Sequence, residues 1–239
     1  MKALGIVVAS LWLVGCAGQS AAPDWFSRSQ SAMSCQAEAS QEQDLALSLA
    51  QEMASDGRLH AALAHLQKLS SDSPQVRLRK ARVLRSLGRD EAQAEYQSLI
   101  GTCLAAEGEH GLGQLALARG AEAEALERLE RAARMEPTDA RMRNDLGVVY
   151  LRQGRPEDAR FEFLTALELD QSSSLSALNL LTLLFYNDQW DQAAELVSRQ
   201  GFSPDQVRGA EARARSLRDV AAAKLPAADV AASTQEQGS

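Results

Sequence analysis

Few side chains in this sequence have the types and the spacing that chemistry requires. His60 and His65 lie five residues apart on one expected helix, and His110 is far along the chain; metal ligands on one helical face lie three or four residues apart. The acidic pair Glu157-Asp158 falls at an expected helix start, where carboxylates interact favourably with the helix dipole. The sequence has no phosphate-binding glycine loop, no Gly-x-Ser-x-Gly motif and no His-Glu-x-x-His motif. We therefore expect no catalytic site, no metal site and no cofactor.

The cysteines are the remaining candidates for chemistry. Cys16 follows Leu13-Val14-Gly15, at the end of an apolar stretch that begins after Met1-Lys2. This stretch is shorter than the roughly 20 residues that a membrane-spanning helix needs. The segment resembles a bacterial lipobox, which implies that residues 1–15 are removed as a signal peptide and that Cys16 carries covalent lipid. Two or three acyl chains make a lasting membrane anchor.

The lipobox resemblance also has consequences for localisation. By the sorting rule of such lipoproteins, Ala17 in place of an aspartate implies an outer-membrane protein whose domain faces the periplasm. An ordinary secretory signal or a signal anchor is the alternative interpretation. Because the periplasm is oxidising, Cys35 and Cys103 form a candidate disulfide; a half-buried Cys103 with a free Cys35 is the alternative.

A repeat of about 34 residues organises the middle of the chain and is the tetratricopeptide (TPR) period. We therefore expect an all-α fold, a right-handed TPR superhelix of antiparallel helix pairs with about five repeats. Small residues should lie where the paired helices cross, and Gly120 and Gly154 should adopt positive φ in the turns. The recurring positions are Leu112-Gly113, Gly120, Ala125, Leu129 and Ala132, repeated as Leu146-Gly147, Gly154, Ala159, Phe163 and Ala166.

The same landmarks divide the chain into segments. A first repeat at about 43–76 ends with Pro74, and the second is shortened, with about three residues too few for a full first helix. Ser203, Pro204 and Gln206 predict the start of a helix over about 205–224, which would cap the last repeat. The predicted segments are a signal peptide at 1–15, a flexible tether at 16–40, a TPR domain at 41–207, a capping helix at 208–225 and a disordered tail at 226–239.

Charge and architecture together limit the function classes. The net charge of −7 would repel a phosphate backbone, so nucleic-acid binding is not expected. A TPR array presents a concave surface that holds another polypeptide and brings no catalytic group of its own. The sequence therefore predicts a protein-binding scaffold without a small-molecule substrate.

The repeat phase predicts which first-helix residues face the groove. Glu107, His110 and Gln114 belong to its earlier part. Its C-terminal half is apolar, and such exposed area commonly marks a binding site for an amphipathic helix or an extended segment. Alternatively, the terminal helix folds over this surface, or its aromatic residues only pack on the next helix pair. The predicted partner-binding residues are Arg141, Asn144, Val148, Leu151, Arg152, Leu178, Phe185 and Tyr186.

Three segments carry a resemblance to one family. They are the lipobox Leu13-Val14-Gly15-Cys16, the repeat segment 144–159 and the atypical last repeat that leads into 202–207. With them, the chain resembles outer-membrane TPR lipoproteins of pilus assembly, most closely the TadD-type lipoproteins of tight-adherence (Tad/Flp) pili. The resemblance implies a pilotin-like protein that assists the localisation or assembly of an outer-membrane secretin. A type IV pilus pilotin, a TPR adaptor of β-barrel assembly or of a cell-wall synthase, and a structural spacer stay open.

Overall fold

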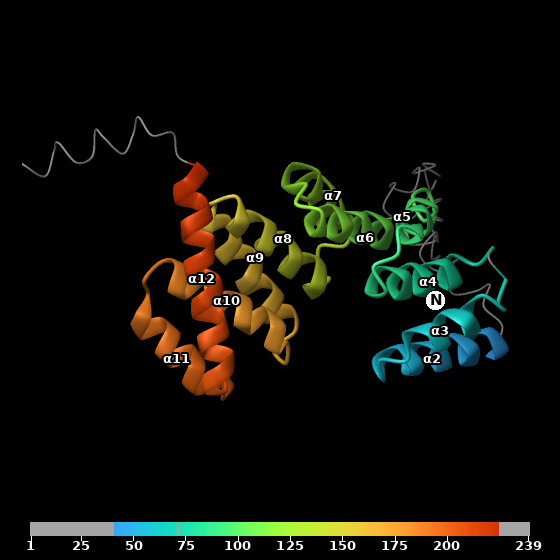
Figure 1. Cartoon of the computed structure of the whole chain (residues 1–239), viewed down its shortest axis with the longest axis horizontal. Helices are drawn as coiled ribbons and strands as arrows, with labels where there is room; N and C mark the ends of the chain where they lie inside the picture. The colour runs from blue at the N-terminus through green and yellow to red at the C-terminus, as the bar shows by residue number, and fades with distance from the viewer. Residues whose placement is uncertain (1–40, 71, 225–239) are drawn as a thin grey trace, which may run out of the picture.

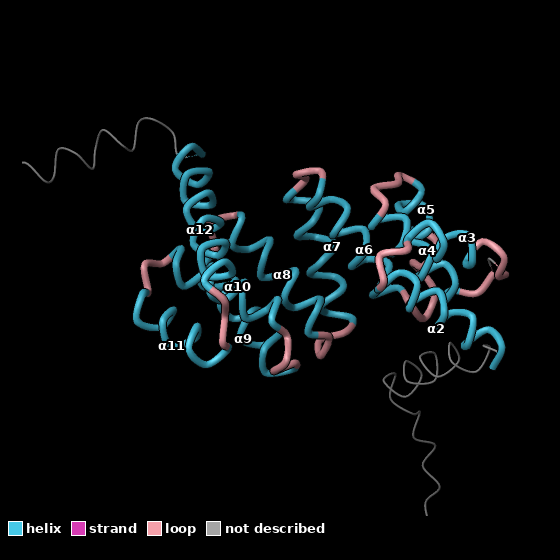
Figure 2. Tube along the Cα trace, turned by 60° about the horizontal axis from the view of Figure 1, so that its bottom comes forward, coloured by secondary structure: helices cyan, strands magenta, loops and turns pink. Residues whose placement is uncertain are grey.

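The computed structural model describes residues 41–70 and 72–224, which form eleven α-helices and no strand. The helices follow one another along an elongated arc (Figure 1), and short loops join them (Figure 2). The expected all-α repeat architecture is confirmed. Five helix pairs and one final helix make up the described chain: α2 (Gln41–Ser55) and α3 (Leu59–Leu66), α4 (Pro74–Ser86) and α5 (Glu91–Gln97), α6 (Ala105–Ala118) and α7 (Glu122–Met135), α8 (Ala140–Arg152) and α9 (Pro156–Leu169), α10 (Ser174–Tyr186) and α11 (Trp190–Gln200), then α12 (Pro204–Lys224).

The terminal segments lie outside the described residues. The expected signal peptide at 1–15, tether at 16–40 and disordered tail at 226–239 lie beyond the described residues and stay predictions. Within 41–70 and 72–224, the chain contains no helix that combines the length and the apolar character needed to span a bilayer.

Small residues let the paired helices approach closely, as the repeat pattern predicts. A Cβ atom on Gly113 would lie 2.7 Å from Leu129 Cγ, and one on Gly147 would lie 2.7 Å from Phe163 Cε1. Both distances are too short for a side chain, so the two helices of each of these pairs can cross only over glycine. In the turn between α8 and α9, Gly154 has a φ of +72°, a backbone conformation that glycine adopts at little cost.

The second pair is shortened in its second helix and not in its first. α4 has 13 residues, whereas α5 has only 7. The expectation of a truncated first helix is wrong because Pro74 begins α4 instead of ending the first repeat. Proline suits the first turn of a helix, where its missing N–H would have no partner, and Ser73 before it has an extended backbone.

Ion pairs join the third and fourth helix pairs internally, with their charges exchanged. In the third, Glu109 of α6 lies 3.1 Å from Arg128 of α7. In the fourth, Arg143 of α8 lies 3.1 Å from Glu162 of α9. Glu109 corresponds to Arg143 in the repeat, and Arg128 corresponds to Glu162. The charge in each helix is therefore opposite to the charge in the helix with which it pairs. Pairing α6 with α9 would bring two carboxylates together, and the exchange therefore favours the correct pairs.

Candidate partner-binding groove

α12 lies in the C-terminal half of the inner face, along α10 and as far as α8 (Figure 1). It begins with the expected capping box: Ser203 N donates to Gln206 Oε1 at 2.9 Å, and Gln206 N donates to Ser203 Oγ at 3.3 Å. Ala210 and Ala214 are fully buried in the apolar cluster that α12 shares with α10. Near the other end of α12, Arg218 Nη1 donates to Asp188 Oδ1 at 2.7 Å. The final helix is thus docked inside the groove rather than stacked on its end.

This position of α12 changes the predicted apolar floor. Leu151 and Phe185 are only 5% and 6% exposed and belong to the cluster that contains Ala210 and Ala214. Leu178 and Tyr186 are partly buried against the same cluster. Of the interpretations that the sequence left open, the structure therefore shows at these residues the one in which the terminal helix folds over the apolar surface.

A smaller cavity of about 410 Å³ is left between α12 and α8. Val148 and Arg152 line it from α8, and Leu217 and Val220 line it from α12. Arg152 Nε also lies 3.2 Å from Oε1 of Glu122, which lines the same cavity. These two predicted groove residues therefore face a side pocket and not the main groove.

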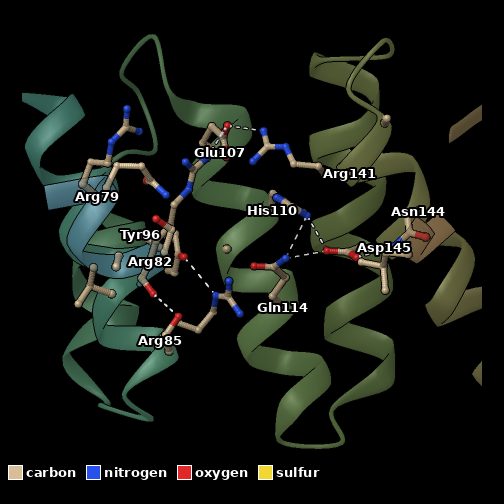
Figure 3. Close-up of a pocket in the computed structure, with 18 of the residues that line it drawn as sticks. Arg79, Arg82, Arg85, Tyr96, Glu107, His110, Gln114, Arg141, Asn144 and Asp145 are labelled. Atoms are coloured by element: carbon tan, nitrogen blue, oxygen red, sulfur yellow. Dashed lines mark hydrogen bonds and ion pairs between the residues drawn. The ribbon is translucent and has the colours of Figure 1, made fainter. Parts of the chain in front are cut away.

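The larger groove has a volume of about 430 Å³ and crosses α2, α4, α6, α8 and the start of α10. Figure 3 shows the arginines of α4 on one side, Asn144 and Asp145 on the other, and His110 and Gln114 between them. The predicted residues Arg141 and Asn144 both line it. Its labelled polar side chains are Arg79, Arg82, Arg85, Glu107, His110, Gln114, Arg141, Asn144 and Asp145.

Glu107 connects three first helices across the groove. Its Oε1 lies 2.9 Å from Arg82 Nη2 of α4 and 2.7 Å from Arg141 Nη2 of α8. Arg141 is also paired with Asp139, at 2.6 Å. Burial alone would raise the pKa of Glu107, but the two arginines hold it below its ordinary value. The ionised Glu107 carboxylate therefore links three successive repeats by ion pairs.

Asp145 is the centre of a second polar network. His110 Nε2 lies 2.8 Å from Asp145 Oδ2, and Gln114 Nε2 donates to the same oxygen at 2.7 Å. Asn144 donates to Asp145 Oδ1 at 3.1 Å and accepts from Asn179 Nδ2 of α10 at 2.9 Å. Burial would raise the pKa of Asp145, but the hydrogen bonds from His110, Gln114 and Asn144 bring it below its ordinary value. The network fixes α6, α8 and α10 relative to one another.

We expect Asp145→Asn to reduce the acid sensitivity of the fold. Because the folded pKa lies below the unfolded value of about 3.9, ionised Asp145 stabilises the fold above about pH 4, and this contribution is lost as the pH falls through the folded pKa. The difference in free energy of unfolding between wild type and variant, measured with urea, should therefore narrow from about pH 5 to about pH 3. Asp191→Asn, on the exposed face of α11, is the control. A difference for Asp145→Asn that stays constant over this range would contradict the assignment.

The arginines of α4 are absent from the predicted groove residues. Arg79, Arg82 and Arg85 lie in the shortened repeat, where the repeat phase is lost. Their spacing of three residues is nevertheless a signal, because such residues share one face of a helix. Because α4 is a complete first helix, these three arginines occupy positions on the inner face.

Among the described residues, the remaining histidines and Cys103 do not line the groove. His60 is exposed and His65 is half-buried, both on α3. The described ranges hold no group of three His, Cys, Asp or Glu side chains arranged for a metal ion. Cys103 is disulfide-bonded. Cys16 and Cys35 lie outside the described residues, so the lipid on Cys16 and the pairing of Cys35 with Cys103 stay predictions.

Fold and groove together define a class of protein, a tetratricopeptide-repeat scaffold that binds protein segments. Residues 110–174 match the tetratricopeptide repeat family model. The chain is 45% identical over 217 residues to the TPR repeat-containing protein PA4299 of Pseudomonas aeruginosa, covering 90% of this chain and 86% of that protein. The chain therefore belongs to the family of PA4299, and neither match indicates a catalytic family.

Solved structures share the fold. PilF of Pseudomonas aeruginosa has a TM-score of 0.57 at 20% identity, over 82% of this chain and 90% of PilF. TTC0263, a thermophilic TPR protein of Thermus thermophilus, has a TM-score of 0.56 at 21% identity, over 73% of this chain and 97% of that one. At these identities the likeness concerns the arrangement of the helices alone.

Proposed function

We propose that this protein is an outer-membrane lipoprotein that holds a segment of a pilus secretin in its TPR groove. Lipid on Cys16 anchors it, and the TPR domain faces the periplasm. In this position it acts as a pilotin for the secretin of a tight-adherence (Tad/Flp) pilus machine. The lipobox and the repeat features described above support the assignment to this class of lipoprotein.

The observation that carries the proposal is that the final helix covers only one half of the inner face and leaves the other half open. α12 fills the C-terminal half of the groove, so the part across α2, α4, α6 and α8 is the concave surface left for a partner. The Glu107 and Asp145 networks hold these helices in place. A preformed groove binds an extended segment at lower entropic cost, because only the segment must be ordered.

Cys16→Ser should leave the fold intact and remove the protein from the outer membrane. The anchor depends on the acyl chains, and residue 16 lies well before the first described helix at Gln41. Membrane fractionation with circular dichroism measures both effects. Cys35→Ser is the matched control and should stay in the outer membrane. A Cys16→Ser variant found there at the wild-type level would mean that protein contacts hold it in place.

The amount of secretin multimer in the outer membrane tests the proposed role. Cells that lack this protein should lose most secretin multimers from the outer membrane, and wild type should restore them while Cys16→Ser should not. Unchanged multimers would contradict a pilotin role. Cross-linking of the groove to a β-barrel assembly protein or a cell-wall synthase instead would favour one of the other adaptor functions.

A further inference from the structure

One wall of the groove is basic although the chain is acidic overall, with a net charge of −7. Arg79, Arg82 and Arg85 line the groove from α4. Arg82 is neutralised by Glu107 at 2.9 Å. Arg85 Nε donates to the hydroxyl of Tyr96, at 3.4 Å. Among the described residues, Arg79 and Arg85 therefore line the groove without a carboxylate oxygen within 4 Å of their guanidinium groups.

Arg79 is the less satisfied of the two. Its Nε is buried and has no hydrogen-bond partner in residues 41–70 and 72–224. Burial, followed by the neighbouring charge of Arg82, lowers the pKa of Arg79 by more than the nearby Glu107 carboxylate raises it, so the charged form is held at a cost. An anion that accepted from this guanidinium would remove the cost, and a carboxylate matches its fork of donors in a bidentate arrangement.

We propose that Arg79 and Arg85 bind carboxylates of an acidic, extended segment of the protein partner. The proposal rests on the proposed function in one respect, that a protein segment occupies this groove. The two positions lie six residues apart, about 9 Å along α4. Alternate side chains on one face of an extended strand are about 6.7 Å apart, so two carboxylates in an i, i+2 arrangement can reach both guanidinium groups.

The remaining lining gives the segment a direction. The opposite end of the groove carries Asp170 and the apolar Leu175, which is 60% exposed. Glu107 and Asp145, between the two ends, are already engaged by their own partners. The acidic residues of the segment therefore lie along α4, and the part of the segment that continues across the groove meets Asp170 and Leu175. A uniformly charged phosphate backbone fits less well, because its far end would meet the Asp170 carboxylate.

Peptide binding to the full lipidated protein, purified in a neutral detergent, tests the proposal. The probes are a labelled twelve-residue peptide with alternating glutamates and its glutamine counterpart, followed by fluorescence anisotropy. The glutamate peptide should bind at least about tenfold more tightly, since hydrogen bonds to charged groups are the stronger kind. The double variant Arg79→Gln/Arg85→Gln should bind both peptides equally. Arg134→Gln/Arg199→Gln, with the same charge change at exposed positions, should behave as wild type.

Several outcomes would overturn the inference. Equal affinity of wild type for both peptides would do so, as would an unchanged preference in a folded Arg79→Gln/Arg85→Gln variant. Tighter binding of a single-stranded oligonucleotide, lost in the same variant, would assign the wall to phosphate instead. Capture of the secretin equally by wild type and double variant would refute this inference alone. Retained glutamate-peptide preference without any secretin capture would refute the proposed function alone.

Discussion

Gly111→Ala is expected to destabilise the protein by about 3 kcal/mol, which is the upper range for overpacking a close-packed core. A Cβ atom on Gly111 would lie 2.1 Å from Tyr96 Cε1, and two further ring atoms lie within 2.4 Å. Tyr96 is only 1% exposed and its ring lies against Gly111, so an added methyl group forces the ring to shift. The clash must push α5 away from α6, and urea unfolding should show a lower midpoint.

Gly209→Ala is the matched control, since Gly209 also lies within a helix. The nearest atom to its added Cβ is Arg213 Nη1 at 3.5 Å, an ordinary contact. This substitution should stabilise the protein by about 0.5–1 kcal/mol, because alanine loses less backbone entropy than glycine on entering a helix. If Gly111→Ala unfolded at the wild-type midpoint, the close packing of α5 on α6 would be contradicted.

The regular repeats are predictable from the sequence because their packing restricts which residue types can occupy particular positions. Helices that cross over Gly113 and Gly147 accept no side chain there, and the turn at Gly154 needs positive φ. Each requirement is local, so it recurs in the sequence at the repeat spacing. At Pro74 the residue type does not determine the structure. A proline can follow one helix or begin the next, and the sequence alone does not distinguish the two.

The interior of the groove depends on contacts that no local pattern encodes. Asp145 meets His110 and Gln114 of the preceding repeat, and that approach is set by the rotation between α6 and α8. The position of α12 on the inner face is likewise not encoded by a local sequence pattern. Its small apolar face, with Ala210 and Ala214, suits either the end of the last repeat or the inner side of α10. Only the three-dimensional packing selects the inner side.

Ala214→Glu is expected to release α12 from the groove. Ala214 is fully buried between α12 and α10, and a carboxylate there would lie in an apolar cluster without a partner. We expect a loss of about 2 kcal/mol or more, measured by urea unfolding, since an unpaired buried charge belongs to the most damaging substitutions. Hydrogen exchange should become fast in 204–224 and stay slow in the N-terminal helix pairs, which have a separate core.

Ala212→Glu introduces the same charge two residues away on the exposed side of α12 and should leave stability and exchange unchanged. The pair of variants also decides which half of the inner face holds the partner. Secretin capture by Ala214→Glu should equal that of wild type, because the groove across α4, α6 and α8 does not include α12. Stronger capture by Ala214→Glu would show instead that α12 occupies the binding surface, with Leu178 and Phe185 as the floor that a partner helix would take.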